Sequence, residues 1–275
     1  MDNEITLVGG DKRSYWAAQY LRQQGMDVRC CGVPGEEGQV IPKTIRNLIL
    51  PFPSFQGELI RGASAIPVRA LLPSLGQGSR VFGGMLGPMA AVFHESGARC
   101  CELYGTEPLT TANAAVTAEA AVFLAMERLP VALEGANCLV IGFGRIGKLL
   151  AQKLRSLGAE VCVCARNAGD RAMAEAWGCK ADQTGVYHGG LSPYAVVFNT
   201  VPHEVLSPSQ LAQLSPDCLL IELASAPGGY DPTVCSVLGL QHIAAAGLPG
   251  RYAPKTAGIL YAQSILAFPE GEDEP

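Results

Sequence analysis

The stretch from residue 137 to residue 166 constrains the fold of this chain more than any other part of the sequence. It starts with an apolar run, residues 138–141, of the kind found in strands that are buried on both faces. Three glycines follow with the spacing G-x-G-x-x-G, namely Gly142, Gly144 and Gly147. A leucine-rich helical pattern and a second apolar run, residues 160–164, complete the stretch. The order of strand, glycine turn, helix and strand predicts part of a parallel α/β sheet.

The glycine turn favours the binding of a dinucleotide. In such a turn the first glycine allows the sharp bend, the second lets the backbone approach a pyrophosphate, and the third lets the helix pack against the strand. Unpaired N–H groups at the helix start favour an anion. We therefore expect a Rossmann dinucleotide-binding domain, with cofactor contacts from the glycines and from Arg145 and Ile146. The alternative is a glycine turn that serves packing alone, and the surrounding strand and helix disfavour it.

The residues after the second strand of this stretch distinguish NAD from NADP. An acidic residue usually stands there and binds the ribose hydroxyl of NAD, but this chain has Arg166 and Asn167. A guanidinium suits the 2′-phosphate of NADP, and Arg171 adds a second positive charge. NADP is therefore favoured over NAD, with contacts from Arg166 and Asn167. The alternative is that Arg166 is solvated and that Asp170 turns inward and binds the ribose of NAD.

Length and composition exclude several classes of protein. With 275 residues, 48% of them hydrophobic and 16% charged, the chain can form two well-packed domains. The net charge of −5, without a basic run, offers no electrostatic surface for nucleic acid or an anionic membrane. The first residues do not resemble a signal peptide, and the apolar segment 112–126 is shorter than the ~20 residues of a membrane span. We expect a cytoplasmic protein in which this segment is a buried helix.

The ten cysteines are interpreted as reduced core residues. Most of them fall within expected strands, and no two have C-x-x-C spacing. A buried free cysteine behaves as a small hydrophobic side chain. The four histidines are scattered along the chain, so we expect no metal site.

The order of the expected elements predicts two domains. A strand at 5–8 and a helix at 14–24 open a smaller, doubly wound α/β domain, in which residues 51–78 form a long irregular connection. A long helix over 109–128 leads from it into the Rossmann domain. The expected boundaries are 1–108 for an N-terminal substrate domain, 109–254 for the Rossmann domain, 255–268 for a C-terminal helix that completes the substrate domain, and 269–275 for an acidic tail.

Candidate site residues gather where the expected strands end, because the carboxyl ends of parallel strands meet at one edge of a sheet. Two loops of the Rossmann domain supply further expected cofactor contacts, from Thr200, Val201 and Pro202 and from Ala224 and Ser225. Loops of both domains supply expected substrate contacts, from Asp11, Gly247, Leu248, Pro249 and Arg251. Asp11 and Arg13 both lie where strand ends usually face a crevice, and their alternative role is capping and charge pairing at the start of the following helix.

The long helix carries two further candidates. Asn113 and Thr117 are four residues apart, so they share one face of the helix, and we assign them to the substrate crevice. Their alternative role is local bonding to the backbone. Glu119 points elsewhere and serves either the crevice or the helix surface.

The whole chain resembles the A-type subunits of dipicolinate synthase, an NADP-linked family of spore-forming bacteria. The resemblance covers nearly all 275 residues. Its most specific strings are Leu223-Ala-Ser-x-Pro-Gly-Gly229 and Gly247-Leu-Pro-Gly-x-x-Ala-Pro-Lys-Thr-Ala-Gly258. Further matches are Val8-Gly-Gly-Asp11, Ile49-Leu-Pro51, Asn113-x-x-x-Thr117-x-Glu119, Ala165-Arg166 and Asn199-Thr-x-Pro202. The chain departs from the pattern at Ala226, where a basic side chain is expected, and at Ala246.

The resemblance implies the oxidation of dihydrodipicolinate, or of hydroxytetrahydrodipicolinate after loss of water, to dipicolinate, with the hydride passing to NADP. It also implies the flavoprotein-like B-type subunit of dipicolinate synthase as partner, a homo-oligomer, and a place in the mother cell during spore formation. On this basis Lys255 and Thr256 are assigned to one carboxylate of the substrate, Asn113 and Thr117 to the same crevice, and Arg251 to the second carboxylate. Alternatively, Lys255 pairs with an acid while Pro254 and Thr256 cap the helix.

Two other functions remain open at this point. One is a 2-hydroxy acid dehydrogenase, which normally needs a histidine–carboxylate pair and an arginine; His203 and His242 show no such pattern. The other is a non-catalytic, nucleotide-binding regulatory protein, for which Ala226 is the only indication.

Overall fold

The computed structural model of the protein describes residues 3–36 and 38–269, and it divides into two compact units. The first unit comprises Met1–Asn113 and Pro249–Pro275, and the second comprises Ala114–Leu248. The chain passes from one unit to the other within α3 (Glu107–Arg128) and again within α8 (Leu248–Tyr252). Of the expected acidic tail, residues 270–275 lie outside the described residues.

The first unit is built on a parallel sheet with the order β2-β1-β3-β7-β8. Its strands are β1 (Glu4–Val8), β2 (Asp27–Cys31), β3 (Asn47–Ile49), β7 (Arg80–Gly83) and β8 (Arg99–Glu102). Helices α1 (Lys12–Gln23) and α9 (Pro254–Leu266) cover one face, and α2 (Met89–Glu95) covers the other. Because the chain moves from β1 to β2 on one side and to β3 on the other, the sheet has a switch point between β1 and β3.

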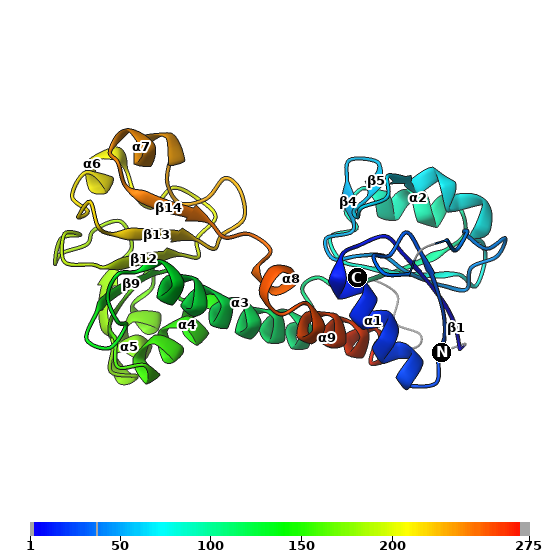
Figure 1. The fold of residues 1–275 in the computed structure, drawn as a ribbon, viewed down its shortest axis with the longest axis horizontal. Helices are drawn as coiled ribbons and strands as arrows, with labels where there is room; N and C mark the ends of the chain where they lie inside the picture. Colours follow the sequence, from blue (N-terminus) through cyan, green and yellow to red (C-terminus); the bar gives the residue numbers. More distant parts are fainter. Residues whose placement is uncertain (1–2, 37, 270–275) are drawn as a thin grey trace. The chain divides into compact units, whose positions relative to one another are not determined.

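Helices α1 and α9 lie side by side although they come from opposite ends of the chain (Figure 1). Small residues permit this close packing, because a methyl group added at Gly258 would lie 2.3 Å from the carbonyl oxygen of Arg13. Tyr261 and Ile265 of α9 complete the core over β1, and the Tyr261 hydroxyl donates to the carbonyl of Leu50 at 2.8 Å. The C-terminal helix is thus part of the first unit.

The second unit is built on a six-stranded parallel sheet with the order β11-β10-β9-β12-β13-β14. Its strands are β9 (Asn137–Ile141), β10 (Glu160–Ala165), β11 (Lys180–Gln183), β12 (Val196–Asn199), β13 (Leu219–Glu222) and β14 (Gln241–Ala244). Its helices are α4 (Arg145–Ser156), α5 (Ala168–Ala176), α6 (Pro208–Leu211) and α7 (Pro232–Val237). In chain order the strands run 3-2-1-4-5-6, the order of a Rossmann fold, so the predicted α/β class is confirmed.

Two predictions about irregular segments were wrong. Residues 51–78 contain a small antiparallel sheet of β4 (Phe55–Gln56), β5 (Leu59–Ile60) and β6 (Ile66–Pro67), followed by the short 3₁₀ helices η1 (Val68–Ala70) and η2 (Leu72–Ser74). Each strand has only two residues, which is too short for an alternating pattern to appear in the sequence. The expected loop after β14 also contains α8, whose five residues are shorter than any periodic signal.

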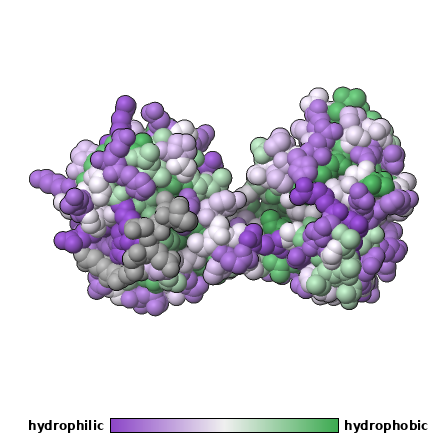
Figure 2. Space-filling model, turned by 180° about the vertical axis from the view of Figure 1, so that it is seen from behind, coloured by the Kyte–Doolittle hydropathy of each residue, from purple (hydrophilic) through white to green (hydrophobic). Residues whose placement is uncertain are grey.

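The interpretation of the cysteines is confirmed, since all ten are free and buried. The long helix expected over residues 109–128 is present as α3. It has 22 residues and is long and apolar enough to cross a membrane, and half of its most apolar 18-residue stretch is buried. A single helix of this kind is a weak indication of a membrane span, because core helices of soluble proteins have the same properties. Hydrophilic and hydrophobic side chains are interspersed over the face of each unit drawn in Figure 2.

Candidate functional site

The glycine turn between β9 and α4 has the close contacts that its spacing predicts. Gly142 has a φ of +97°, and its N–H donates to the carbonyl of Cys164 on β10 at 2.8 Å. A methyl group added at Gly147 would lie 2.1 Å from the carbonyl oxygen of Gly142. A methyl group added at Gly144 would meet no atom within 4 Å, so the backbone there is open to a ligand. Gly144 is also the N-cap of α4 and has no side chain to bond the first amides.

The next loop, after β10, contains the exposed residues Arg166 and Asn167. Asn167 caps α5, with its side-chain oxygen accepting from the amide of Asp170 at 2.6 Å. The carboxylate of Asp170 bonds the Asn167 amide at 2.5 Å and lies 3.6 Å from the ammonium of Lys148. Arg171 donates to the carbonyls of Ala165 and Arg166, at 2.9 and 2.7 Å, and so stabilises the loop. Among the described residues the guanidinium of Arg166 has no hydrogen-bond or ion-pair partner.

Two polar residues connect the loops after β12 and β13. Asn199 and Glu222 end these neighbouring strands and lie opposite each other in the sheet. The carboxylate of Glu222 accepts from the Asn199 amide at 2.7 Å and from the backbone amides of Ala224 and Gly229 at 3.0 and 2.8 Å. Asn199 also bonds both backbone groups of Val201. The pair therefore fixes the loops that contain the expected cofactor contacts Val201, Ala224 and Ser225.

Burial raises the pKa of Glu222. The hydrogen bonds from Gly229, Asn199 and Ala224 favour the ionised form and offset only part of this effect.

Thr200 connects the glycine turn to the loop after β12. Its hydroxyl donates to the carbonyl of Ile141 at 2.9 Å, and a methyl group added at Gly142 would lie 2.3 Å from this hydroxyl oxygen. The parallel strands thus bring the expected cofactor contacts together at one edge of the sheet, from Gly142, Gly144, Arg145, Ile146 and Gly147 after β9, Arg166 and Asn167 after β10, Thr200, Val201 and Pro202 after β12, and Ala224 and Ser225 after β13.

In the first unit the expected residue Asp11 lies at the switch point of the sheet. It caps α1 by accepting from the amide of Arg13 at 2.8 Å, and it pairs with the Arg13 guanidinium through both carboxylate oxygens. Partial burial alone would raise the pKa of Asp11, but the hydrogen bonds and charge of Arg13, with the charge of Arg61, lower it. The capping and pairing that were considered as alternatives are therefore present, and the same two residues line a narrow pocket.

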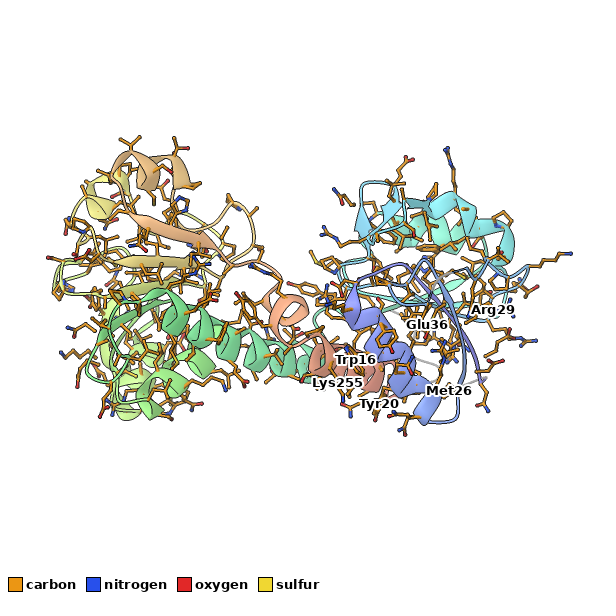
Figure 3. All side chains as sticks on the ribbon, in the orientation of Figure 1. Trp16, Tyr20, Met26, Arg29, Glu36 and Lys255 are labelled. Carbon is orange, nitrogen blue, oxygen red and sulfur yellow. The ribbon has the colours of Figure 1, made fainter. Side chains whose placement is uncertain are left out.

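The remaining candidates occupy different environments. Lys255 is exposed at the start of α9, with its ammonium 4.9 Å from the ring centre of Trp16 on α1 (Figure 3). Thr256 is exposed beside it. Arg251 is exposed and stands over the ring of Tyr252 at 5.5 Å. Asn113 lines the pocket that contains Asp11, whereas Thr117, one turn further along α3, is buried.

One pairing was missed from the sequence. Glu222 was not recognised as a partner of Asn199, although both are polar residues that end apolar runs. Arg13 was expected beside Asp11 at a strand end that faces a crevice, and it lines the pocket there, but no contact with the substrate was assigned to it. Among the described residues, no group of three or more His, Cys, Asp or Glu side chains is arranged to bind a metal.

Comparison with known proteins identifies relatives of this arrangement. A curated relative, the A-type subunit of dipicolinate synthase from Bacillus subtilis (strain 168), is 26% identical over 95% of this chain and 94% of its own length. The solved structure of the A-type subunit from Bacillus halodurans has a TM-score of 0.87 at 24% identity and covers 96% of each chain. That of the A-type chain of dipicolinate synthase from Bacillus subtilis has a TM-score of 0.83 at 26% identity, over 96% of this chain and 95% of the other. The predicted resemblance is thus confirmed.

Residues 109–249, just over half of the chain, match the family described as D-isomer specific 2-hydroxyacid dehydrogenase, NAD binding domain. The match supports an oxidoreductase that uses a nicotinamide cofactor. By this domain, the chain belongs to the D-isomer specific 2-hydroxyacid dehydrogenase family.

Proposed function

We propose that this protein is the dehydrogenase component of a dipicolinate synthase, which oxidises dihydrodipicolinate, or hydroxytetrahydrodipicolinate after loss of water, to dipicolinate. The substrate loses a hydride and a proton as its ring becomes aromatic. The single observation that supports this most is the similarity to the A-type subunits of dipicolinate synthase along nearly the whole chain, in both units. By the same similarity we propose a homo-oligomer that works with the flavoprotein-like B-type subunit in the cytoplasm of the mother cell of a sporulating bacterium.

The residues of the second unit fit a bound nicotinamide dinucleotide. The backbone at Gly144 is open, and the N-terminus of α4 has no side-chain cap, which suits a pyrophosphate. The loops after β12 and β13 are held by Asn199 and Glu222 at the same edge of the sheet. NADP in this position would supply the hydride acceptor, while the protein positions the substrate and excludes water.

The cofactor proposed is NADP. Asp170, which would bind the ribose hydroxyl in the NAD alternative, is engaged with Asn167 and Lys148. Arg166 is exposed at the end of β10, where a 2′-phosphate would lie. Both observations support NADP over NAD.

We expect Arg166→Asp to reverse the preference for NADP. A charge-assisted hydrogen bond contributes about 1.5–3 kcal/mol, so the ratio of the two Kd values should change roughly tenfold or more. Calorimetric titration with NADP and with NAD measures this ratio. Arg69→Asp, an exposed arginine of the first unit, is the matched control and should leave the ratio unchanged. Tighter binding of NAD than of NADP by the unaltered protein would contradict the assignment.

We propose that the substrate is contacted by residues of two kinds of segment, the loops that follow strands and the helices that adjoin them. Asp11, Asn113, Lys255 and Thr256 are residues of the first unit. Thr117 is on α3, Gly247 directly precedes α8, and Leu248, Pro249 and Arg251 are residues of α8. In this proposal Lys255 and Thr256 bind one carboxylate, because an ammonium and the backbone amides of a helix start both favour an anion.

Lys255→Ala is expected to weaken dipicolinate binding and to lower kcat/KM, while NADP affinity and the melting temperature stay nearly constant. The ammonium stands over an aromatic ring at an exposed position, where such a contact contributes only about 0.5–1 kcal/mol to stability. Titration of dipicolinate and thermal melting of the variant test this, with Lys180→Ala on the exposed edge strand β11 as control. A lower melting temperature with unaltered kinetics would show that Lys255 is structural.

Turnover of a panel of substrates distinguishes the proposed reaction from its two alternatives. The protein should reduce NADP with freshly made dihydrodipicolinate, measured with and without the B-type subunit, and not with 2-hydroxy acids. Turnover of a 2-hydroxy acid instead would identify the alternative dehydrogenase. Among the described residues His203 and His242 have no carboxylate partner, which disfavours that reaction. Binding of NADP without turnover of either class would identify a regulatory protein.

A further inference from the structure

The guanidinium of Arg13 is held in one orientation by Asp11. Its Nε lies 3.0 and 3.1 Å from the two carboxylate oxygens of Asp11, and its Nη2 lies 2.8 Å from one of them. The carboxylate is fixed in turn by the backbone amide of Arg13, at 2.8 Å. A guanidinium has five N–H donors in a planar fork, and this pairing uses the edge formed by Nε and Nη2. Among the described residues Nη1 has no hydrogen-bond partner, so the second edge can bind another carboxylate.

Arg13 lines a narrow pocket at the switch point of the first unit. Asp11, Ser14 and Asn113 are further polar residues of the pocket, and Phe52 and Tyr261 contribute aromatic rings to its lining. The pocket has room for about one water molecule, which is also the size of a carboxylate oxygen. Clefts at the carboxyl ends of parallel strands, at a switch point, are where α/β sheets usually bind ligands.

Glycines surround the Asp11–Arg13 pair where any side chain would disturb it. A methyl group added at Gly250 would lie 2.9 Å from Nε of Arg13 and 3.2 Å from Oδ2 of Asp11. One added at Gly10 would lie 1.8 Å from the hydroxyl of Ser14, and Gly10 also has a φ of +96°. Gly250, distant from Asp11 and Arg13 in the sequence, therefore lies directly against this pair.

We propose that Arg13, oriented by Asp11, binds the second carboxylate of the substrate, and that Arg251 does not. The proposal rests on the proposed function for the identity of the ligand, a pyridine dicarboxylate or its dihydro precursor. A guanidinium already fixed by one carboxylate loses little conformational entropy on binding another. The positive charge of Arg61 acts on Asp11 and helps to balance the second anion. Arg251, by contrast, is exposed and contacts only the ring of Tyr252 among the described residues.

The test is a titration of dipicolinate into the full-length protein saturated with NADP, for the unaltered chain and five variants. Arg13→Gln should raise the Kd of dipicolinate roughly tenfold or more and raise KM more than it lowers kcat. Arg13→Lys should recover only part of the affinity, because an ammonium cannot bind bidentately. Asp11→Asn keeps the charge of Arg13 but loosens its orientation. The Kd of dipicolinate for this variant should lie between the values for Arg13→Gln and Arg13→Lys. Arg29→Gln, an exposed arginine on β2, is the control and should match the unaltered protein (Figure 3).

Thermal melting of each variant shows whether the first unit is intact, and NADP affinity should stay constant because the glycine turn and its neighbouring loops belong to the second unit. If Arg13→Gln does not fold, the comparison of Arg13→Lys with the unaltered chain decides, and an unchanged Kd overturns the proposal. If the unaltered protein binds dipicolinate and Arg13→Gln binds it equally well, Arg13 is not the carboxylate-binding residue while the proposed function stands. A loss of affinity in Arg251→Gln but not in Arg13→Gln would reassign the role to Arg251. If the unaltered protein does not bind dipicolinate, the proposed function fails and this assignment fails with it.

Discussion

Gly147→Ala should destabilise the second unit and abolish tight NADP binding, whereas Gly144→Ala should affect NADP binding alone. The methyl group added at Gly147 would lie 2.1 Å from a backbone oxygen, that of Gly142, so no rotamer change can relieve the contact. Overpacking of this kind costs about 1–3 kcal/mol, which corresponds to roughly 2–10 °C in the melting temperature of a domain of this size. The methyl group added at Gly144 meets no atom within 4 Å, so the fold should be unaltered.

The difference between the two variants is the informative result. At Gly144 the new methyl group would occupy the space through which the backbone approaches the pyrophosphate, and we expect NADP affinity to fall roughly tenfold or more. Thermal melting and NADP titration of both variants measure the two effects separately. If Gly144→Ala binds NADP as tightly as the unaltered protein, the turn does not contact the pyrophosphate and serves packing alone.

Glu222→Ala should loosen the loops after β12 and β13. The substitution leaves the backbone amides of Ala224 and Gly229 and the side chain of Asn199 without their acceptor. A buried group left unpaired costs about 1–3 kcal/mol. Because Asn199 keeps its bond to Val201 and Ala224 is only partly buried, the free energy of unfolding of the second unit should fall by about 2–4 kcal/mol. Denaturant unfolding measures this loss, and NADP titration should show weaker binding. Glu175→Ala, on the exposed face of α5, is the control. An unchanged free energy of unfolding would show that solvent or other acceptors replace the carboxylate.

Glu222 should also give the second unit a specific pH dependence. Because burial raises its pKa above the ordinary value of 4.5, the stability that it contributes is fully present below that value and is lost as pH rises through the folded pKa. Glu222→Gln has no proton to lose at this position. The stability of the unaltered protein relative to Glu222→Gln should therefore decrease as pH rises through this window. A relative stability that increases instead would mean that the hydrogen bonds to the carboxylate outweigh its burial.

Much of the fold could be predicted because its central strands are buried on both faces and read as apolar runs. The glycine spacing then identified β9 and α4, since only glycine fits the contacts at Gly142 and Gly147. The two-residue strands β4, β5 and β6 escaped prediction because they have no period to detect.

The candidate site was harder to predict for a different reason. The contact of Asn199 with Glu222 depends on β12 and β13 being neighbours, which a list of strands does not reveal. The setting of Arg13 depends on Gly250 and on Asn113, which come from distant parts of the sequence. Sequence reasoning therefore identified the loops that contain candidate residues, but not which side chains within them meet.

The most direct test of the proposed reaction is a single turnover, with the protein in excess over dihydrodipicolinate and saturated with NADP. Oxidation of the ring should transfer one hydride per molecule, so NADPH, followed by its absorbance, and dipicolinate, identified by mass spectrometry, should appear together in equal amounts. For the unaltered chain the account predicts equal amounts of NADPH and dipicolinate. For Gly144→Ala, tested at subsaturating NADP, it predicts that this stoichiometry is lost. Dipicolinate formed without NADPH, or NADPH formed from a 2-hydroxy acid and not from dihydrodipicolinate, would contradict it.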